Sequence, residues 1–564
     1  SVRHKVICTD MRYIAQAGGK MNQKAYKAWI HGHIITMNEK MPSAEAMAAD
    51  QDGNLIYVGS EDGVKAYLSD ETTLEDLEGN TVTPGFIEGH SHPDMYGNVL
   101  RSLKVRDVSK EEILRRVADA VKEMAPGQWL IAGMGFNNEV WTDPSYPTRE
   151  ELDAVAPDVP VFIPRMDGHM AWVNSRVFEL CGITKDTANP EGGEFFRTPS
   201  GELQGCVVDE AMKMIQQYIP EKTMEERKKD YLAAQQSFLS CGITSVNDMG
   251  VELASIQALT ELCEEGKMKL RYYGGLMDFA GKNANAEKRA FLASCPKIGL
   301  YKDHLSFRCC KFLGDGAVGA QSAHLKEAYT DRPGHTGIGM YTDEELYEAF
   351  KEAADHGMQI AIHAIGDATI EQVLNTYRRL QEEKDYGDHR WRLEHFQTVT
   401  SDTPEQAAAL HVIPSMQPMH APNSAGMAPR RLGPDRVHGA YAAGRVLRAT
   451  GIVSLGSDAP VATPSPLSGM HAAITRTNDA LEPKGGFCME NALTPEEALK
   501  GYTIWGAYAI FAEKTRGSLE PGKYADFVVM DQDPLTLGHE NPDALLQVKV
   551  RKTVIGGECV YEEK

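Results

Sequence analysis

The sequence predicts an α/β fold: a (β/α)8 TIM barrel with a long insertion after its first strand, plus a small β-sandwich domain formed by the N- and C-terminal segments. Three observations lead to this prediction. Eight short apolar runs alternate with mostly helix-length stretches, one gap between runs is far too long for a single connection, and both ends of the chain carry short alternating segments. Eight βα units are the number that closes a TIM barrel.

Each apolar run is followed by turn residues and has the length of a buried strand. Many of the stretches between them have a helical pattern, as in residues 342–355, where charged and apolar residues alternate with helical spacing. The eight runs are residues 84–89, 242–247, 269–276, 307–313, 358–364, 391–396, 412–416 and 452–457.

The gap between the first and the second run is too long for one crossover connection. We therefore expect residues 100–235 to form an inserted subdomain that lies over the end of the first strand. The loops at the C-terminal ends of the strands build the active sites of TIM barrels, so the insertion is expected close to the site.

Both ends of the chain have the sequence pattern of short strands joined by turns. Residues 27–60 alternate apolar and polar positions around Asp52-Gly-Asn, and residues 522–530 and 548–557 resemble them. We expect residues 21–83 and 515–564 to form the β-sandwich and residues 84–514 to form the barrel domain. Residues 1–20 contain no apolar core of a signal peptide and are interpreted as an extension.

Composition narrows the function classes. A formal net charge of −22 argues against nucleic acid or an anionic membrane as partner, and no apolar run reaches the length of a membrane span. Ten cysteines without C-x-x-C spacing, including the neighbours Cys309 and Cys310, indicate free thiols in a reducing compartment. These features predict a cytoplasmic protein that acts on a small molecule, with a homodimer left open as its assembly.

A His-x-His pair follows the first apolar run. His90 and His92 close the segment Thr83-Pro-Gly-Phe-Ile-Glu-Gly-His-Ser-His. Side chains alternate along a strand, so both imidazoles would point the same way and could share one metal ion. A second pair, His31 and His33, falls in the first expected strand of the N-terminal domain, far in sequence from other ligand types, and is interpreted as structural.

Metal-binding side chains also end four later runs. Each of them alone has an ordinary structural interpretation. Because the C-terminal ends of parallel barrel strands meet at one rim, however, six such groups would converge on one place, which favours a metal site. They are His90, His92, Lys311, His363, His395 and Asp458.

The motifs resemble the metal-dependent amidohydrolase superfamily, and within it amidohydrolase family 3, the branch that contains N-substituted formamide deformylases. The resemblance rests on Pro-Gly-Phe-Ile-x-x-His-x-His, Lys-Phe-x-x-Asp-Gly, His-Ala-Ile-Gly-Asp, Glu-His and Gly-Ser-Asp-Ala-Pro, and it extends from about residue 27 to the end. The family usually has Asp two residues before its first metal-binding His, where this chain has Glu88, which can still orient a ligand from behind it.

The resemblance implies a role for each residue of the set. His90, His92 and Asp458 would hold the more buried metal ion, and His363 and His395 the more exposed one. Lys311 would bridge the two as an N-carboxylated lysine, and an unmodified Lys311 would imply a site with one metal. Burial in an apolar strand would favour the neutral amine that this modification requires. The expected cofactor is Zn²⁺, as one or two divalent ions.

The implied reaction is hydrolysis of a non-peptide C–N bond, in an amide, N-acyl or N-formyl group, by a metal-bound hydroxide. Asp458 would act as the proton shuttle, and His169, in the insertion, would donate a hydrogen bond to the substrate oxygen. Three alternatives remain: a deaminase, an esterase or lactonase on the same scaffold, and a catalytically inactive scaffold protein.

The substrate is less well defined. Aromatic and methionine side chains near the predicted mouth suggest an apolar substituent, although ordinary packing explains any one of them. Arg476 is a candidate contact for an anionic group. The residues of the predicted mouth are Met95, Tyr96, Phe136, Trp141, Trp172, Phe396, Met416 and Met419.

Overall fold

A computed structural model describes residues 24–563 except 107, 126, 134, 139–140 and 166–169. The chain divides into two compact units, one of residues 93–234 and the other of the segments before and after it. Among the described residues, none of the helices combines the length and the apolar character needed to cross a membrane.

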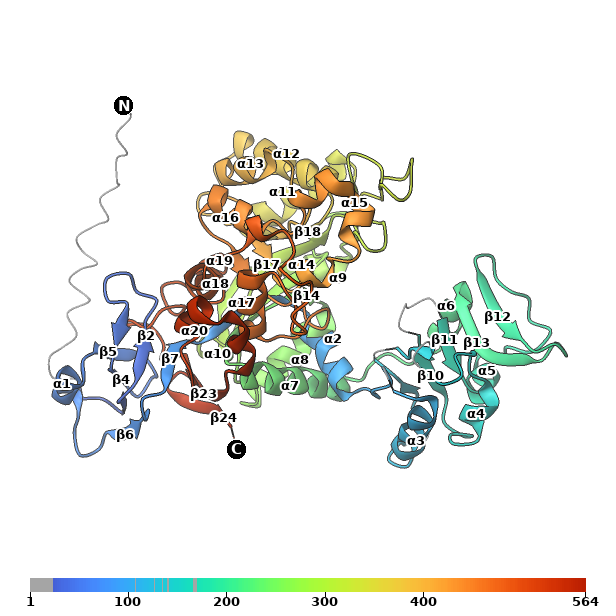
Figure 1. Ribbon diagram of the computed structural model, residues 1–564, viewed down its shortest axis with the longest axis horizontal. Helices are drawn as coiled ribbons and strands as arrows, with labels where there is room; N and C mark the ends of the chain where they lie inside the picture. Colours follow the sequence, from blue (N-terminus) through green and yellow to red (C-terminus); the bar gives the residue numbers. More distant parts are fainter. Residues whose placement is uncertain are drawn as a thin grey trace. The chain divides into compact units, whose positions relative to one another are not determined.

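The larger unit contains a parallel sheet of eight strands, of which β14, β17 and β18 are labelled in Figure 1. The order along the sheet is β21-β20-β19-β18-β17-β15-β14-β8, and the short strand β16 (Lys297–Gly299) pairs antiparallel with β17. One strand lies at each of the eight predicted apolar runs. They are β8 (Phe86–Ser91), β14 (Ile243–Val251), β15 (Arg271–Met277), β17 (Leu305–Leu313), β18 (Gln359–Ala364), β19 (Arg392–His395), β20 (Ile413–Met416) and β21 (Ser454–Leu455).

The first and the last strand approach each other and nearly close the barrel. The amide of Asp458 donates to the carbonyl of His90 over 2.7 Å, and that of His92 donates to the carbonyl of Ala459 over 2.9 Å. Glycine permits this approach, since a Cβ atom on Gly89 would lie 2.4 Å from the carbonyl oxygen of Leu455. The sheet is therefore a nearly closed parallel barrel.

Helices follow the strands, as the sequence pattern predicts. Helix α11 (Asp343–Asp355) begins at a capping box, in which the side chain of Thr342 accepts from the amide of Glu345 and the Glu345 carboxylate accepts from the amide of Thr342. Its Phe350 packs against Phe312 of β17 and Tyr377 of the next helix. Further helices of this unit are α8 (Leu253–Glu264), α12 (Asp367–Glu383), α13 (Thr403–Ala409), α16 (Ala443–Thr450) and α17 (Pro466–Thr475).

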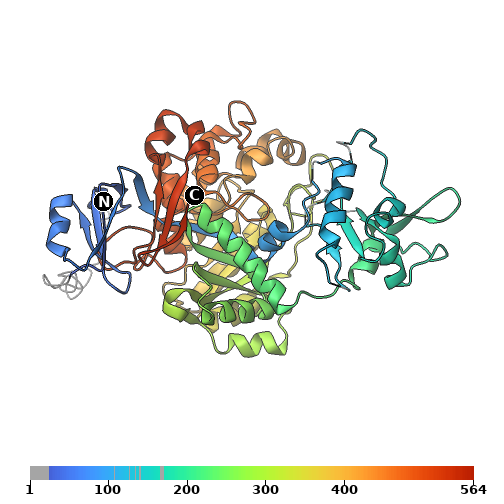
Figure 2. The same cartoon turned by 90° about the horizontal axis from the view of Figure 1, so that it is seen from below.

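The two ends of the chain share one sheet. Strand β7 (Thr81–Pro84) pairs antiparallel with β22 (Phe527–Met530), so that N-terminal (blue) and C-terminal (red) strands lie side by side (Figure 2). The six-stranded sheet has the order β24-β23-β22-β7-β2-β3, and a four-stranded sheet has the order β5-β4-β1-β6. The other strands are β1 (Lys27–Ile30), β2 (His33–Ile35), β3 (Ser43–Ala44), β4 (Ala46–Ala49), β5 (Leu55–Gly59), β6 (Thr73–Asp76), β23 (Val550–Ile555) and β24 (Glu558–Glu562).

The sequence suggested that the second His-x-His pair lies inside one strand, but the structure places its two histidines differently. His31 lies between β1 and β2 with a φ of 55°, and His33 is the first residue of β2. The imidazole Nδ1 of His31 is 2.9 Å from Asp76 Oδ2, and this hydrogen bond raises the pKa of His31. Both histidines are exposed, and His31 has a surface carboxylate as its partner.

The unit of residues 93–234 has its own sheet, in the order β12-β13-β11-β10-β9. Phe136, Trp141 and Trp172 are buried in its core, with ring centroids of Phe136 and Trp141 5.4 Å apart. The expectation that these three rings line the mouth of the site was wrong, because they pack against one another. The elements are α2 (Pro93–Arg101), α3 (Lys110–Val121), β9 (Leu130–Ile131), α4 (Arg149–Asp153), β10 (Val161–Pro164), β11 (Met170–Val173), α5 (Ser175–Cys181), β12 (Gly193–Arg197), β13 (Leu203–Asp209) and α6 (Glu210–Gln216).

A buried ion pair joins the barrel to the C-terminal segment. Arg271, the first residue of β15, donates from Nε and Nη2 to the two oxygens of Asp526, over 2.6 and 3.0 Å. The amide of Gly556 also donates to Asp526, and both charged side chains are almost fully buried. Burial works to raise the pKa of Asp526, but the charge and the hydrogen bonds of Arg271, the charge of Arg516 and the amide of Gly556 together outweigh it and lower that pKa.

We expect Asp526→Asn to lower the free energy of unfolding by about 3–5 kcal/mol, because it leaves the Arg271 guanidinium buried without its counter-charge. Chemical denaturation monitored by circular dichroism measures the change. The matched control is Asp531→Asn, which removes a more exposed partner 3.6 Å from Arg551 and should cost less than about 1 kcal/mol. Equal losses in the two variants would contradict the structural role of the buried pair.

Candidate metal centre

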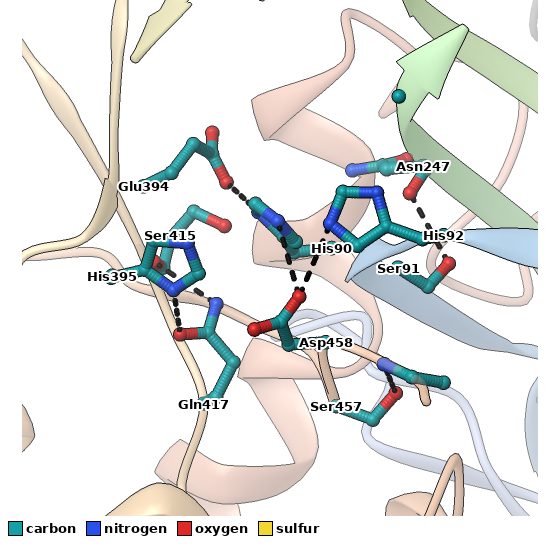
Figure 3. Close-up of polar contacts among 12 residues, drawn as sticks. His90, Ser91, His92, Asn247, Glu394, His395, Ser415, Gln417, Ser457 and Asp458 are labelled. Atoms are coloured by element: carbon teal, nitrogen blue, oxygen red, sulfur yellow. Dashed lines mark hydrogen bonds and ion pairs between the residues drawn. The ribbon is translucent and has the colours of Figure 1, made fainter. Parts of the chain in front are cut away.

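The six predicted ligands converge at the C-terminal ends of the barrel strands. His90 and Lys311 lie within β8 and β17, His363 is the penultimate residue of β18, and His395 ends β19. His92 and Asp458 follow the ends of β8 and β21. Figure 3 shows His90, His92 and Asp458 pointing toward one another, with His395 beside them.

His90, His92 and Asp458 form the tightest group. Oδ1 of Asp458 lies 3.6 Å from Nε2 of His90 and 3.3 Å from Nε2 of His92. One donor atom from each residue falls within 4.8 Å of the others, a spacing that allows three ligands to surround one ion. Burial works to raise the pKa of Asp458, but the hydrogen bond with His92 and nearby imidazoles outweigh it and lower that pKa, which keeps the carboxylate ionised.

An unpartnered nitrogen shows that this group fits a cation. Nε2 of His90 is buried and has no hydrogen-bond partner, although Nδ1 of the same ring is bonded. A buried polar atom without a partner carries a cost that coordination would remove. Burial lowers the pKa of His90 to about 4, so the imidazole is neutral at pH 7 and can offer its lone pair to a divalent ion.

A chain of buried charges orients His90 from behind. Nδ1 of His90 lies 2.5 Å from Glu394 Oε2, and Arg392 donates from Nε to Glu394 Oε1 over 2.6 Å. Arg392 also donates to the carbonyl of Gly89 and to the hydroxyl of Ser415. A carboxylate on the far nitrogen fixes the tautomer and the orientation of a metal-binding imidazole, so Glu394 and Arg392 preset His90 for its ligand role.

Glu88, which stands where the family usually has Asp, holds the first and last strands together. Its Oε1 accepts from the amide of Ser457 over 2.7 Å and from the amide of His90 over 3.1 Å. Burial raises the pKa of Glu88 to about 7, against the opposite effect of these two amides. The side chain therefore positions the backbone of two candidate ligand segments instead of reaching the ion.

A second candidate group contains a histidine that the sequence reasoning missed. His395, His420 and Asp458 each place a donor atom within 4.8 Å of the others. Nδ1 of His395 is 2.8 Å from Gln417 Oε1, which leaves Nε2 available to an ion. Nε2 of His420 is buried without a hydrogen bond and lies 3.9 Å from Oδ2 of Asp458. The sequence feature that could have identified His420 is its position four residues after β20, since the other candidate ligands also lie at the C-terminal ends of barrel strands.

His363 and Lys311, the remaining two predicted ligands, belong to neither of these two groups. The ring centroid of His363 is 4.5 Å from that of His395, but its Nε2 lies 3.1 Å from the carbonyl of Gly316, so Nδ1 is the nitrogen available to an ion. Lys311 is almost fully buried, and its ammonium forms no hydrogen bond or ion pair with any described residue. Burial lowers the pKa of Lys311, which favours the neutral amine that reacts with CO₂.

Other predicted residues have varied surroundings. His169 lies outside the described residues, so its role stays a prediction. Met416 and Met419 are buried, and Met416 lines a small pocket together with His395. Phe396 is fully buried. Met95 and Tyr96 belong to the unit of residues 93–234, where Met95 is exposed.

Comparisons with a family model and with known proteins all point to the same protein family. The model of the amidohydrolase family (Amidohydro_3) matches residues 73–561. The chain is 30% identical to protein LONG AFTER FAR-RED 3 of Arabidopsis thaliana, over 94% of this chain and 91% of that protein. It is 26% identical to the N-substituted formamide deformylase of Arthrobacter pascens, over 94% and 98%.

A solved structure shares the fold over most of the chain. An uncharacterized metal-dependent hydrolase from Pyrococcus furiosus superposes with a TM-score of 0.74 and 27% identity, over 90% of this chain and 99% of that one. The family match covers well over half of the sequence and includes every candidate ligand described above. The chain therefore belongs to the amidohydrolase family, as a metal-dependent hydrolase.

Proposed function

We propose that this hydrolase cleaves a non-peptide C–N bond, in an amide, N-acyl or N-formyl group of a small molecule. The observation that carries the proposal is the convergence of His90, His92 and Asp458 on one point, with Nε2 of His90 buried and unpartnered. The similarity to an N-substituted formamide deformylase supports the choice of bond. The buried Met416, which lines a pocket together with His395, supports an apolar substituent on the substrate.

The residues divide the chemistry among them. A bound divalent ion, for which we propose Zn²⁺, would polarise the substrate carbonyl and activate water. Asp458 directs Oδ1 toward the histidine pair, and its Oδ2 lies 3.9 Å from Nε2 of His420. This second oxygen would accept a proton from the attacking water and return it to the leaving amine. An amine leaves poorly unless it is protonated, and one carboxylate can serve both steps.

We propose that Lys311 completes a site for two ions after N-carboxylation. The modification would convert an amine into a carboxylate that can bridge two cations, with His363 and His395 on the outer ion. Two facts support this: Lys311 is buried close enough to His90, His363 and His395 for its charge to act on their pKa values, and burial lowers its own pKa. An unmodified Lys311 would leave the inner group of His90, His92 and Asp458 as a site for one ion.

The experiment that tests the proposed bond is a panel of matched N-formyl, N-acetyl, ester, lactone and cyclic amidine compounds with zinc-reconstituted protein. We expect release of a free amine from the N-acyl compounds. Chelation should abolish this activity, and Zn²⁺ should restore it. Release of ammonia from the cyclic amidines alone would indicate a deaminase, and hydrolysis of the esters or lactones alone would also contradict the proposal.

Glu394→Gln should weaken zinc binding by about 10- to 100-fold, because it removes the carboxylate that fixes the His90 ring. Competition with a zinc-sensitive dye measures the affinity without any assay of activity. His33→Gln, which changes an exposed histidine that belongs to none of the candidate metal groups, is the matched control and should bind zinc like the unaltered protein. Unchanged affinity in Glu394→Gln would remove the proposed orienting role.

Asp458→Asn should lower kcat by at least about 100-fold, since the amide cannot carry the proton from water to the leaving amine. Steady-state kinetics with zinc content measured on the same sample separates loss of the proton carrier from loss of the ion. Asp402→Asn, an exposed carboxylate, serves as control. An Asp458→Asn variant that keeps full activity would refute the shuttle.

Lys311→Met should reduce the metal content from two ions per chain to one. Methionine keeps much of the apolar volume of the lysine stem but cannot form the carbamate. Elemental analysis by mass spectrometry measures the ratio of metal to protein. Two ions per chain in the variant, or one in the unaltered protein, would contradict the bridging role.

A further inference from the structure

A small pocket adjoins the candidate metal centre and ends on an arginine. His395 lines the pocket, and so does Arg476, the residue that follows helix α17. Its free volume of about 10 Å³ is close to the space of a single water-sized sphere, so only a small group can enter it without displacing side chains. The lining residues are His395, Gln397, Met416, Gln417, Pro418, Ala421, Tyr441, Ala443 and Arg476.

The Arg476 guanidinium is buried but only partly satisfied. The residue is 1% exposed, and its Nε donates to the carbonyl of Phe487 over 2.8 Å. Its Nη2 is buried and has no hydrogen-bond partner. The guanidinium carbon lies 6.0 Å from the centre of the Phe487 ring, and the charge of Glu490 acts on Arg476 from beyond ion-pair distance. Burial lowers the pKa of Arg476 to about 10, so the group still carries its charge at neutral pH.

The other buried arginines of the described chain differ in this respect. Each of them has a carboxylate within ion-pair distance, whereas Arg476 has a backbone carbonyl as its acceptor. Burying a charge without a counter-charge costs free energy. A neutral side chain could donate a hydrogen bond to the Phe487 carbonyl without this cost, so the hydrogen bond alone does not explain why the residue is an arginine. The four pairs are Arg271 with Asp526, Arg390 with Glu513, Arg392 with Glu394 and Arg516 with Asp303.

We propose that Arg476 binds the carboxylate of an acidic substrate, so that this pocket is an anion subsite beside the metal centre. A carboxylate offers two oxygens to a guanidinium, and it would supply the missing counter-charge. The substrate class is then an N-acyl compound that carries a carboxylate. Only the carboxylate is small enough for this pocket, so the rest of the substrate would lie outside it. This inference rests on the proposed function and narrows its substrate.

The test compares two ligands that contain no hydrolysable bond, 4-methylpentanoate and 4-methylpentan-1-ol, by isothermal titration with zinc-loaded protein. We expect the acid to bind at least tenfold more tightly than the alcohol. Arg476→Gln should reduce this preference to less than threefold while its zinc content is unchanged. Arg448→Gln, an exposed arginine on α16, is the control and should keep the full preference.

Two outcomes would overturn the proposal. Equal affinity of the two ligands for the unaltered protein would show that no anion subsite exists. A preference that persists in Arg476→Gln would show that the carboxylate binds the zinc ion or another group. If Arg476→Gln does not fold, Arg476→Lys provides the second measurement: loss of the planar fork should weaken acid binding at least fivefold and leave alcohol binding unchanged, and unchanged acid binding would refute the role of Arg476.

The binding assay is independent of catalysis. If the acid binds through Arg476 but no N-acyl compound is cleaved, the proposed reaction fails and the subsite stands. If N-formyl and N-acetyl amines are cleaved but the acid shows no preference, the reaction stands and the subsite fails. The two proposals can therefore fail separately.

Discussion

The approach of the first barrel strand to the last is the constraint on which the metal centre depends. Backbone hydrogen bonds between the ends of β8 and β21 bring the His90 segment next to Asp458, and Glu88 accepts amides from both segments. Glycine at position 89 makes the contact sterically feasible. If the two strands moved apart, His90 and His92 would lie too far from Asp458 for the three residues to hold one ion.

A buried ion pair lies behind His90, on the side of the ring away from Asp458. Arg392 and Glu394 are two residues apart on β19, so alternation points both side chains to the same face, where Glu394 reaches His90. Burying such an ion pair brings little stability. Its value is orientation, since it fixes which nitrogen of His90 faces the ion. Arg476 is the exception among the buried arginines, because its charge awaits a partner that the described chain does not supply.

Much of this architecture could be predicted from the sequence. The eight strands follow from short apolar runs, and the candidate ligands from polar residues that end those runs. His420 was missed because it lies beyond the end of β20, where strand periodicity no longer applies. Phe136, Trp141 and Trp172 were misplaced because aromatic composition alone cannot distinguish the core of an inserted unit from the lining of a pocket. The surroundings of Arg476 could be seen only in the structure, because the sequence does not show whether an arginine is buried or exposed.

The near-closure of the barrel also has a consequence for folding kinetics. Glu88 and Ser457 are 369 residues apart in the sequence, so the contact between them has a large loop-closure entropy and belongs to the slowest class of native contacts. The candidate ligands therefore come together only after nearly the whole chain has been ordered. A bound ion would stabilise the complete barrel over partly folded forms, and the rate at which a refolding chain takes up the ion would then report the final step of assembly.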